Sequence, residues 1–402
     1  MINKIKVAIK EGTLFEKIKN KLWAIFSKAI VPFIRLFNKV DNNTIMFITF
    51  QGNYNCNQKA IADEIIRRKL PYKLYWAVRK VNLEDLDQYP KELNIVKRES
   101  FKFYKALAQS KFIFENSTNF AYMNLHKRKG QLLLQTWHGS MGFKRLDPKS
   151  VSDKRWVKKA KYTGDITDFC ITNSKFEEDV FRESYWPKTN FLKYGHARND
   201  CLFNKHNEFK TYLDKVHKYY NLPKDTHICL YAPTFRDNYS FESYNLDYSK
   251  LHEALVKRFG GKWCILARFH FKLREFKVPE KYINNVINAT DYNDIQELLC
   301  ASDVGITDYS SWMCDYVLTR RPGFLYASDI QEYVDDERGF YYPLKSTPFK
   351  VAEDSDELVK RIMEFDDKEY QVEIDKFLKE RGCYESGDAS KKIVDKLIEL
   401  SK

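Results

Sequence analysis

The chain has 402 residues, of which 44% are hydrophobic, and it carries a formal net charge of +13. A hydrophobic share of this size can build cores in two or three domains, which excludes disorder as the main state. The positive charge indicates an anionic partner, which is nucleic acid, an acidic membrane surface or a phosphorylated substrate.

The first forty residues are more basic than the rest of the chain, with nine lysines and arginines against two glutamates, a net charge of +7. Apolar residues recur there at three- and four-residue steps, as in Leu14, Ile18, Leu22 and Ile25, which predicts an amphipathic helix. Such a helix either lies in the interface of an anionic membrane or packs on the protein's own core.

From residue 45 onwards, short apolar runs alternate with helix-length segments. The runs are "TIMFITF", "YKLYWAV", "LNIVKR", "KFIFENS", "GQLLLQTW", "DFCITNS" and "NFLKY". This alternation predicts parallel strands joined by crossover helices. Ser174, followed three residues later by Glu177, forms a capping box that predicts the start of a helix.

A turn at 221–226 separates this unit from a second one with strands at "HICLYAP", "KWCILAR", "NVINAT", "DVGIT" and "GFLYAS". The tail from residue 353 has helical periodicity. We therefore predict four parts: a basic amphipathic segment at 1–40, an α/β domain at 41–220, a second α/β domain at 221–350, and C-terminal helices at 351–402.

Four loops that follow predicted strands have unusual polar content. They are "WHGS" at 137–140, "APTFRD" at 232–237, "ARFH" at 267–270 and "TDYSSWMCD" at 307–315. Open α/β sheets bind ligands at the carboxyl ends of their strands, so two such domains would bring these loops together at a cleft. His138 would lie there, although a lone histidine fits a core or surface position equally well.

The loop at 307–315 has the pattern of a phosphate site, because Ser310 and Ser311 precede a helix beginning near Trp312. The alternative is ordinary N-capping by Ser310 or Asp308. Arg268 and His270 would point the same way from an extended segment and clamp a diphosphate. Their alternative is a surface salt bridge and a core histidine.

Six motifs in this order, "TWHGS", "GHARND", "YAPTFRD", "RFH", "ITDYSSWMCDY" and "RGFYY", resemble the CDP-glycerol glycerophosphotransferase family. Members of that family are cytosolic, membrane-associated enzymes that build teichoic acids and related capsule polymers. The resemblance runs from about residue 45 to 400. It implies an α/β, GT-B-like fold, in which a Rossmann-like acceptor domain at 41–220 and a Rossmann-like CDP-donor domain at 221–350 face each other across a cleft. The segment at 1–40 would then serve for membrane association.

The resemblance also implies roles for individual residues. His138 corresponds to the general base that deprotonates the acceptor hydroxyl, and His270, the second catalytic residue, would neutralise charge on the diphosphate. The residues implied to bind the substrate are Gly139, Ser140, Met141, Gly142, Arg198, Pro233, Thr234, Arg268, Phe269, Ser310, Ser311 and Asp315.

The activity implied by the resemblance is transfer of glycerol phosphate from CDP-glycerol to a hydroxyl of a polyprenyl-diphosphate-linked acceptor, with release of CMP. We expect a peripheral, monotopic protein on the cytoplasmic face of the membrane, because no signal peptide and no spanning segment occur in the sequence. The eight cysteines occur singly, which predicts reduced thiols. We expect no metal and no cofactor, since no carboxylate cluster accompanies the loops.

The chain departs from the family pattern at Ser140 and Met141, at Phe271 and at Tyr342. These departures touch the donor side, so CDP-ribitol stays open as an alternative donor. A GT-B glycosyltransferase that uses a nucleotide sugar is a second alternative. A non-catalytic basic module is the third, although no nucleic-acid-binding motif is present and we expect no nucleic-acid partner.

Overall fold

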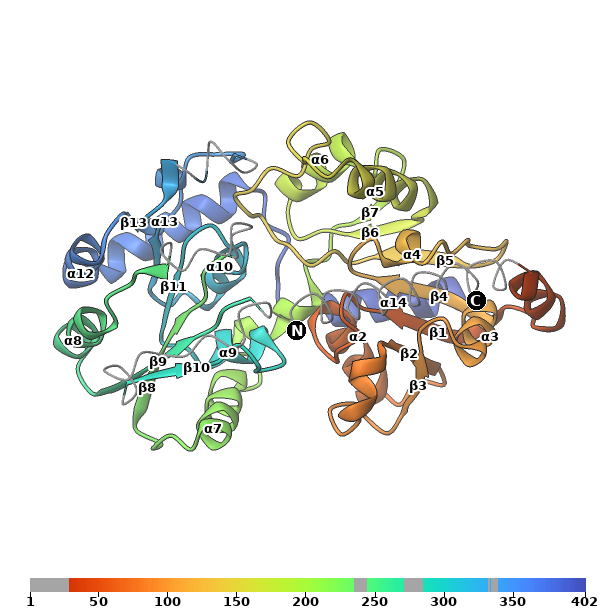
Figure 1. The fold of residues 1–402 in the computed structure, drawn as a ribbon, viewed down its shortest axis with the longest axis horizontal. Coiled ribbons are helices and arrows are strands. Elements are labelled where there is room, and N and C mark those ends of the chain that lie inside the picture. Colours follow the sequence, from red (N-terminus) through yellow and green to blue (C-terminus); the bar gives the residue numbers. More distant parts are fainter. Residues whose placement is uncertain (1–28, 235–243, 271–284, 332, 334–338) are drawn as a thin grey trace, which may run out of the picture.

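The computed structural model describes residues 29–234, 244–270, 285–331, 333 and 339–402. These residues form two domains, each built around one parallel β-sheet with helices packed against it (Figure 1). This is the GT-B-like arrangement of two Rossmann-like domains that was predicted. All eight cysteines are free thiols.

The first domain contains a seven-stranded sheet in the order β3-β2-β1-β4-β5-β6-β7. Its strands are nearly continuous apolar runs, because helices cover a parallel sheet and bury its strands. The strands are β1 (Asp41–Ile48), β2 (Lys73–Val78), β3 (Leu93–Lys97), β4 (Ser110–Glu115), β5 (Leu132–Gln135), β6 (Phe169–Ile171) and β7 (Asn190–Leu192).

Short connections and helices link these strands. They are α2 (Cys56–Arg67), η1 (Lys80–Glu84), α3 (Phe101–Gln109), α4 (Asn119–Tyr122), α5 (Lys154–Ile166), α6 (Lys175–Ser184) and η2 (Ala197–Phe203). Ser174 caps α6 by accepting a hydrogen bond from the Glu177 amide, as its sequence pattern predicts. The Glu177 carboxylate accepts from the amide of Asn173.

The second domain contains a six-stranded sheet in the order β10-β9-β8-β11-β12-β13. The strands are β8 (Thr226–Tyr231), β9 (Lys262–Ala267), β10 (Val286–Asn288), β11 (Val304–Thr307), β12 (Gly323–Tyr326) and β13 (Lys350–Ala352). The last strand was not predicted, because an edge strand of three residues leaves little periodicity to detect.

The helical segments after η2 are α7 (Glu208–Tyr220), α8 (Tyr248–Phe259), α9 (Ile295–Ala301), α10 (Trp312–Tyr316), η6 (Val317–Thr319), η7 (Leu344–Ser346), α12 (Ser355–Met363), α13 (Asp367–Glu380) and α14 (Ala389–Ser401). Helix α7 falls in the range expected for the first domain, yet it packs against α9 and buries Val216 in the core of the second.

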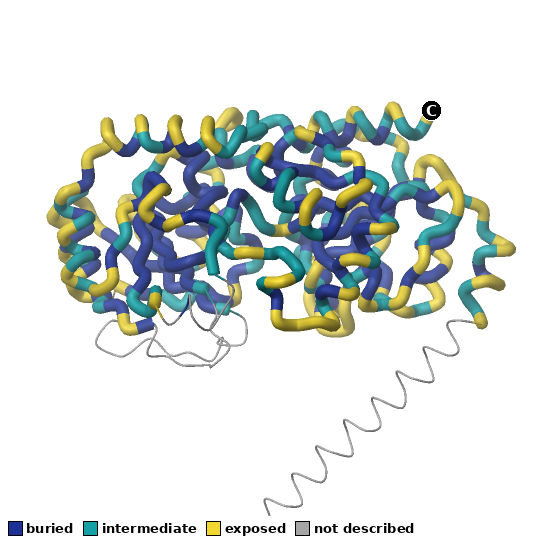
Figure 2. The backbone as a smooth tube through the Cα atoms, turned by 90° about the horizontal axis from the view of Figure 1, so that it is seen from above, coloured by how far each residue is buried: buried dark blue, intermediate teal, exposed yellow. Residues whose placement is uncertain are grey.

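The C-terminal helices do not form one unit. Helices α12 and α13 contribute Ile362 and Ile374 to the core of the second domain, whereas α14 returns to the first domain and packs against α2 (Figure 1). Ile393 and Leu397 of α14 are fully buried there. Figure 2 shows the buried residues concentrated inside each domain, and the C-terminal end of the chain at one edge of the molecule. The chain therefore crosses between the domains twice.

The basic segment at 1–40 is described only in part. Residues 29–37 are helical, and the earlier part of the predicted helix lies outside the described residues. Ile34 is buried against the first domain, while the side chains of Phe33, Leu36 and Phe37 are exposed. Across the part of the chain that the structure describes, no helix has both the length and the apolar character needed to cross a bilayer.

Candidate functional site

The carboxyl ends of the two sheets meet at a cavity of about 680 Å³ between the domains, here called the cleft cavity. Its first-domain wall is formed after β1 and β5 and includes Phe50 and His138. Its second-domain wall is formed by the loops after β8, β9, β10 and β11. Six predicted residues of the second domain line it, namely Pro233, Thr234, Arg268, Phe269, His270 and Ser310.

His138 follows β5 and is held in one orientation. Its Nδ1 atom lies 2.5 Å from the backbone oxygen of Asn116, which follows the neighbouring strand β4. Because a carbonyl oxygen can only accept, Nδ1 carries the proton and Nε2 keeps its lone pair in the neutral ring. Desolvation by the walls of the cleft lowers the pKa of His138 below 6.5, although the residue is exposed to solvent. The hydrogen bond to Asn116 opposes this shift, and the positive charge of Arg198 adds to it. The imidazole is therefore neutral at pH 7 and able to take a proton.

Arg268 and His270 line the same cavity, as their spacing predicts. The Nη1 group of Arg268 donates to the backbone oxygen of Ala289 at 3.2 Å and to that of Tyr292. Arg268 thus holds the loop that follows β10 while its charge faces the cleft. Lys144, from the first domain, brings a further positive side chain to the cavity. Positive charge from both domains suits a diphosphate group.

Ser310 and Ser311 lie at the start of α10. The N-cap residue is Ser311, not the Ser310 or Asp308 of the capping alternative, and its side chain makes no capping hydrogen bond. Asp308 instead accepts from the backbone amide of Thr234, at 2.8 Å and 3.1 Å from its two oxygens. This contact ties the loop after β8 to the loop after β11. Two neighbouring strand ends are thereby fixed at the wall of the cleft cavity.

A second, smaller cavity of about 170 Å³ adjoins the first, and we call it the inner cavity. His138, Lys144 and Ser310 line both cavities. The inner cavity also takes four predicted residues that do not line the cleft cavity, namely Gly139, Ser140, Gly142 and Ser311. The loop after His138 and the start of α10 therefore meet at this point.

Three predicted ligand contacts lie behind the cavities instead. Met141 is fully buried among second-domain core residues, and its backbone oxygen accepts from the hydroxyl of Tyr342. Arg198 and Asp315 are buried and pair with each other, with Nε and Oδ2 3.1 Å apart. Arg198 also donates to the backbone oxygen of Gly139. In this structure these residues hold the loop after His138 against the second domain.

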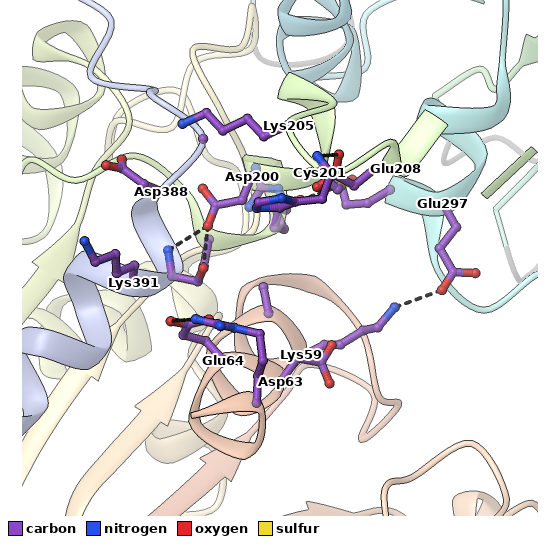
Figure 3. Close-up of a pocket in the computed structure, with 18 of the residues that line it drawn as sticks. Lys59, Asp63, Glu64, Asp200, Cys201, Lys205, Glu208, Glu297, Asp388 and Lys391 are labelled. Atoms are coloured by element: carbon purple, nitrogen blue, oxygen red, sulfur yellow. Dashed lines mark hydrogen bonds and ion pairs between the residues drawn. The ribbon is translucent and has the colours of Figure 1, made fainter. Parts of the chain in front are cut away.

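Another cavity, of about 800 Å³, lies between α2, η2, α9 and the start of α14 (Figure 3). Its charged side chains largely satisfy one another. Lys59 reaches across from α2 to Asp294 and Glu297, at 2.7 Å and 2.9 Å. Asp200 accepts from the backbone amides of Ala389 and Ser390. The cavity therefore marks a cross-linked contact between the domains, whereas the predicted catalytic residues lie in the other two cavities.

Several residues of the site were not predicted. Phe50 is 53% exposed in the cleft cavity, with its ring stacked 6.2 Å from the ring of His138. Thr290 and Asn293 also line the cleft cavity. They follow β10, so the rule that ligands bind at loops after strands would have found them. Glu177 lines the inner cavity from α6, and its sequence signal was read only as a helix cap. Among the described residues, no cluster of three or more metal-ligating side chains occurs.

Comparison with known proteins gives one consistent family. The family model described as CDP-Glycerol:Poly(glycerophosphate) glycerophosphotransferase matches residues 30–399 of this chain. The chain is 31% identical over 381 residues to a teichoic acid poly(glycerol phosphate) polymerase of Staphylococcus epidermidis, and the match covers 90% of this chain and 51% of the relative. The chain thus spans about half the length of that relative.

A second relative is closer in length. A teichoic acid glycerol-phosphate transferase of Staphylococcus aureus is 27% identical over 390 residues, which are 94% of this chain and 98% of the relative. Among solved structures, that of the wall teichoic acid polymerase TagF has a TM-score of 0.80 and 29% identity, and covers 96% of this chain and 98% of that chain. This similarity confirms the arrangement of the two domains.

Proposed function

Because this chain belongs to the CDP-glycerol:poly(glycerophosphate) glycerophosphotransferase family, we propose that it transfers glycerol phosphate from CDP-glycerol to a hydroxyl of a lipid-linked acceptor. CMP is the leaving group. The observation that carries the proposal is the position of His138, which lines both cavities and whose Nδ1 proton is held by Asn116.

In the proposed reaction, the acceptor oxygen bonds to the phosphorus that carries glycerol, and the bond from that phosphorus to the CMP oxygen breaks. The acceptor proton passes to Nε2 of His138, which is neutral at pH 7 because its pKa is lowered. Arg268 and Lys144 supply positive charge as CMP leaves, and His270 brings an imidazole to the same cavity. The loops after β8 and β11, with Thr234 and Ser310, would hold the diphosphate.

The test is a measurement of CMP release from CDP-glycerol, with a glycerol-phosphate primer on a lipid diphosphate as acceptor. His138→Ala should lower turnover by roughly 10²-fold or more, as expected for loss of a general base. His252→Ala on α8, outside both cavities, is the matched control and should keep wild-type turnover. Turnover of CDP-ribitol or of a nucleotide sugar in place of CDP-glycerol would overturn the proposed donor.

The acceptor's lipid anchor requires contact with a membrane, and the helix at 29–37 supplies a suitable surface. Phe33, Leu36 and Phe37 are 62%, 77% and 69% exposed on this helix. The net charge of +7 in the first forty residues would add attraction to anionic lipids. We infer peripheral attachment through this segment to the cytoplasmic face of the membrane.

Vesicle co-sedimentation tests this attachment. Replacing Phe33, Leu36 and Phe37 together by serine should weaken binding to anionic vesicles by at least about 10-fold, because three apolar side chains no longer enter the interface. Val372→Ser on α13 removes an equally exposed apolar side chain elsewhere and should leave binding unchanged. Unchanged binding of the triple variant would exclude this surface.

A further inference from the structure

The inner cavity is placed to hold a group that is bonded directly to the reacting atoms. It shares His138 with the cleft cavity, so a ligand in the inner cavity would lie beside the proposed base. Most of its other lining comes from the first domain, through the loop after β5 and the helix α6. The loop after β11 also reaches it through Ser310 and Ser311, so the inner cavity adjoins the place proposed for the diphosphate.

Its size sets a limit on the ligand. The inner cavity has a volume of about 170 Å³. A protein cavity of about 150 Å³ accommodates one benzene molecule, which has as many non-hydrogen atoms as glycerol. A three-carbon polyol therefore matches the inner cavity in size.

One acidic side chain in the wall has an oxygen available for a ligand. Glu177 is only 2% exposed, and its Oε2 accepts from the amide of Asn173 at 2.9 Å and lies 3.0 Å from Nε2 of His196. Within the described residues, its Oε1 is buried without a hydrogen-bond partner. A buried acceptor left in this state is unfavourable, so a ligand hydroxyl that donates to it would bind favourably.

A neighbouring hydroxyl complements this acceptor. The oxygen of Ser140 accepts a hydrogen bond from the side-chain amide of Asn173 at 2.7 Å, which leaves its proton for donation to a ligand. The same Asn173 contacts Glu177 through its backbone, so the two polar groups are held relative to each other. Aromatic side chains such as Phe176 and Tyr341 form the apolar part of the wall. One acceptor, one donor and an apolar wall match the alternating hydroxyl and methylene groups of a short polyol.

We propose that the inner cavity is a glyceryl subsite, in which Glu177 accepts a hydrogen bond from a hydroxyl of the three-carbon unit next to the reacting phosphate. This rests on the proposed transfer of glycerol phosphate. The glyceryl group is either that of CDP-glycerol or the terminal unit of the acceptor, which have the same chemistry.

The subsite is tested with two variants that act in different ways. Glu177→Gln presents an amide in place of the carboxylate, and Val180→Leu adds bulk at the cavity wall without touching the carboxylate. Glu178→Gln is the matched control, because its neighbouring carboxylate pairs with Arg182 and Lys193 outside the cavity. Val180→Leu keeps the subsite testable if Glu177→Gln does not fold.

The measurements are the Kd values of CDP-glycerol and CDP, and the KM of a primer ending in glycerol phosphate. If the donor occupies the subsite, the affinity of both variants for CDP-glycerol falls by about 10-fold or more. Their affinity for CDP, which lacks the glyceryl group, equals that of the wild type. If the acceptor occupies it, the primer KM rises instead and donor affinity is unchanged.

Wild-type values for all three quantities in Val180→Leu, or in a folded Glu177→Gln, would overturn the subsite. An active wild-type enzyme with unaffected variants refutes only this inference. A wild-type chain that does not turn over CDP-glycerol refutes the proposed function itself.

Discussion

Arg198 of η2 and Asp315 of α10 form a buried ion pair across the two domains, with Nε and Oδ2 3.1 Å apart. The same guanidinium donates to the backbone oxygen of Gly139, directly after the proposed base His138. Asn199, beside Arg198, also donates to Asp315 at 2.8 Å. One contact between the domains therefore positions the catalytic loop.

Breaking this pair on one side should be more harmful than removing it altogether. Arg198→Met leaves the Asp315 carboxylate buried without its counter-charge and should lower the free energy of unfolding by about 3–5 kcal/mol. The double variant Arg198→Met with Asp315→Leu should regain a large part of that loss. Urea unfolding of the two single variants and the double variant measures the coupling, and strictly additive losses would contradict it.

The pH dependence of turnover should report His138. A general base acts when it is deprotonated, and desolvation by the walls of the cleft lowers the pKa of His138 below 6.5. The kcat/KM for CMP release should therefore rise with pH through a midpoint below 6.5 and be level at pH 7. A midpoint at or above pH 7 in wild-type enzyme would argue against His138 as the group that titrates.

The stability of the first domain should depend on Glu115, which is fully buried at the end of β4. Burial raises its pKa from 4.5 to about 8, although the amide of Phe120 donates to its carboxylate. The folded state therefore retains a proton that the unfolded state has lost between about pH 4.5 and 8. Stability should fall as the pH rises across this window.

Glu115→Gln removes the titrating group and keeps nearly the same shape. The decrease in the free energy of unfolding between pH 4.5 and 8, measured by urea denaturation, should become smaller in this variant, by an amount on the order of a few kcal/mol. Glu385, whose pKa burial also raises to about 8, continues to titrate and leaves a residual slope. An identical slope in wild type and variant would show that Glu115 is ionised in the fold.

Gly142 allows the loop after His138 to approach α10. A Cβ atom at this position would lie 2.7 Å from Cβ of Ser311, so alanine should force the two loops apart. Gly142→Ala should cost about 1–3 kcal/mol in stability and raise the KM for CDP-glycerol. Gly260→Ala is the control, because Gly260 has a φ of +74° and no neighbour within 4 Å. Its alanine variant should lose stability through backbone strain and keep the wild-type KM.

The strands and the loops that follow them were predictable because their signals are local. A run such as "KFIFENS" is apolar over the length of one strand, and His138 follows such a run directly. Parallel connectivity then brings the strand ends to the same edge of each sheet. Ser310, Thr234 and His270 could be assigned to one cleft on this basis.

Residues whose partners are remote in sequence were not predictable in the same way. Arg198 could be read as either a ligand contact or a surface charge, because nothing near it in the sequence indicates Asp315, which lies 117 positions away. Met141 was expected to bind substrate, but the loop after β5 extends to the second domain and places its side chain in that core. The exposed partner of His138, Phe50, likewise comes from another strand end.

The sequence by itself determined which segments are strands, which loops end them and which residues with catalytic chemistry those loops carry, because each of these properties depends on neighbours along the chain. Only the tertiary structure decided how the loops are paired, that α14 returns to the first domain, and that a cavity containing Glu177 adjoins His138. These features depend on packing between segments that are far apart in the sequence, which no local pattern reports.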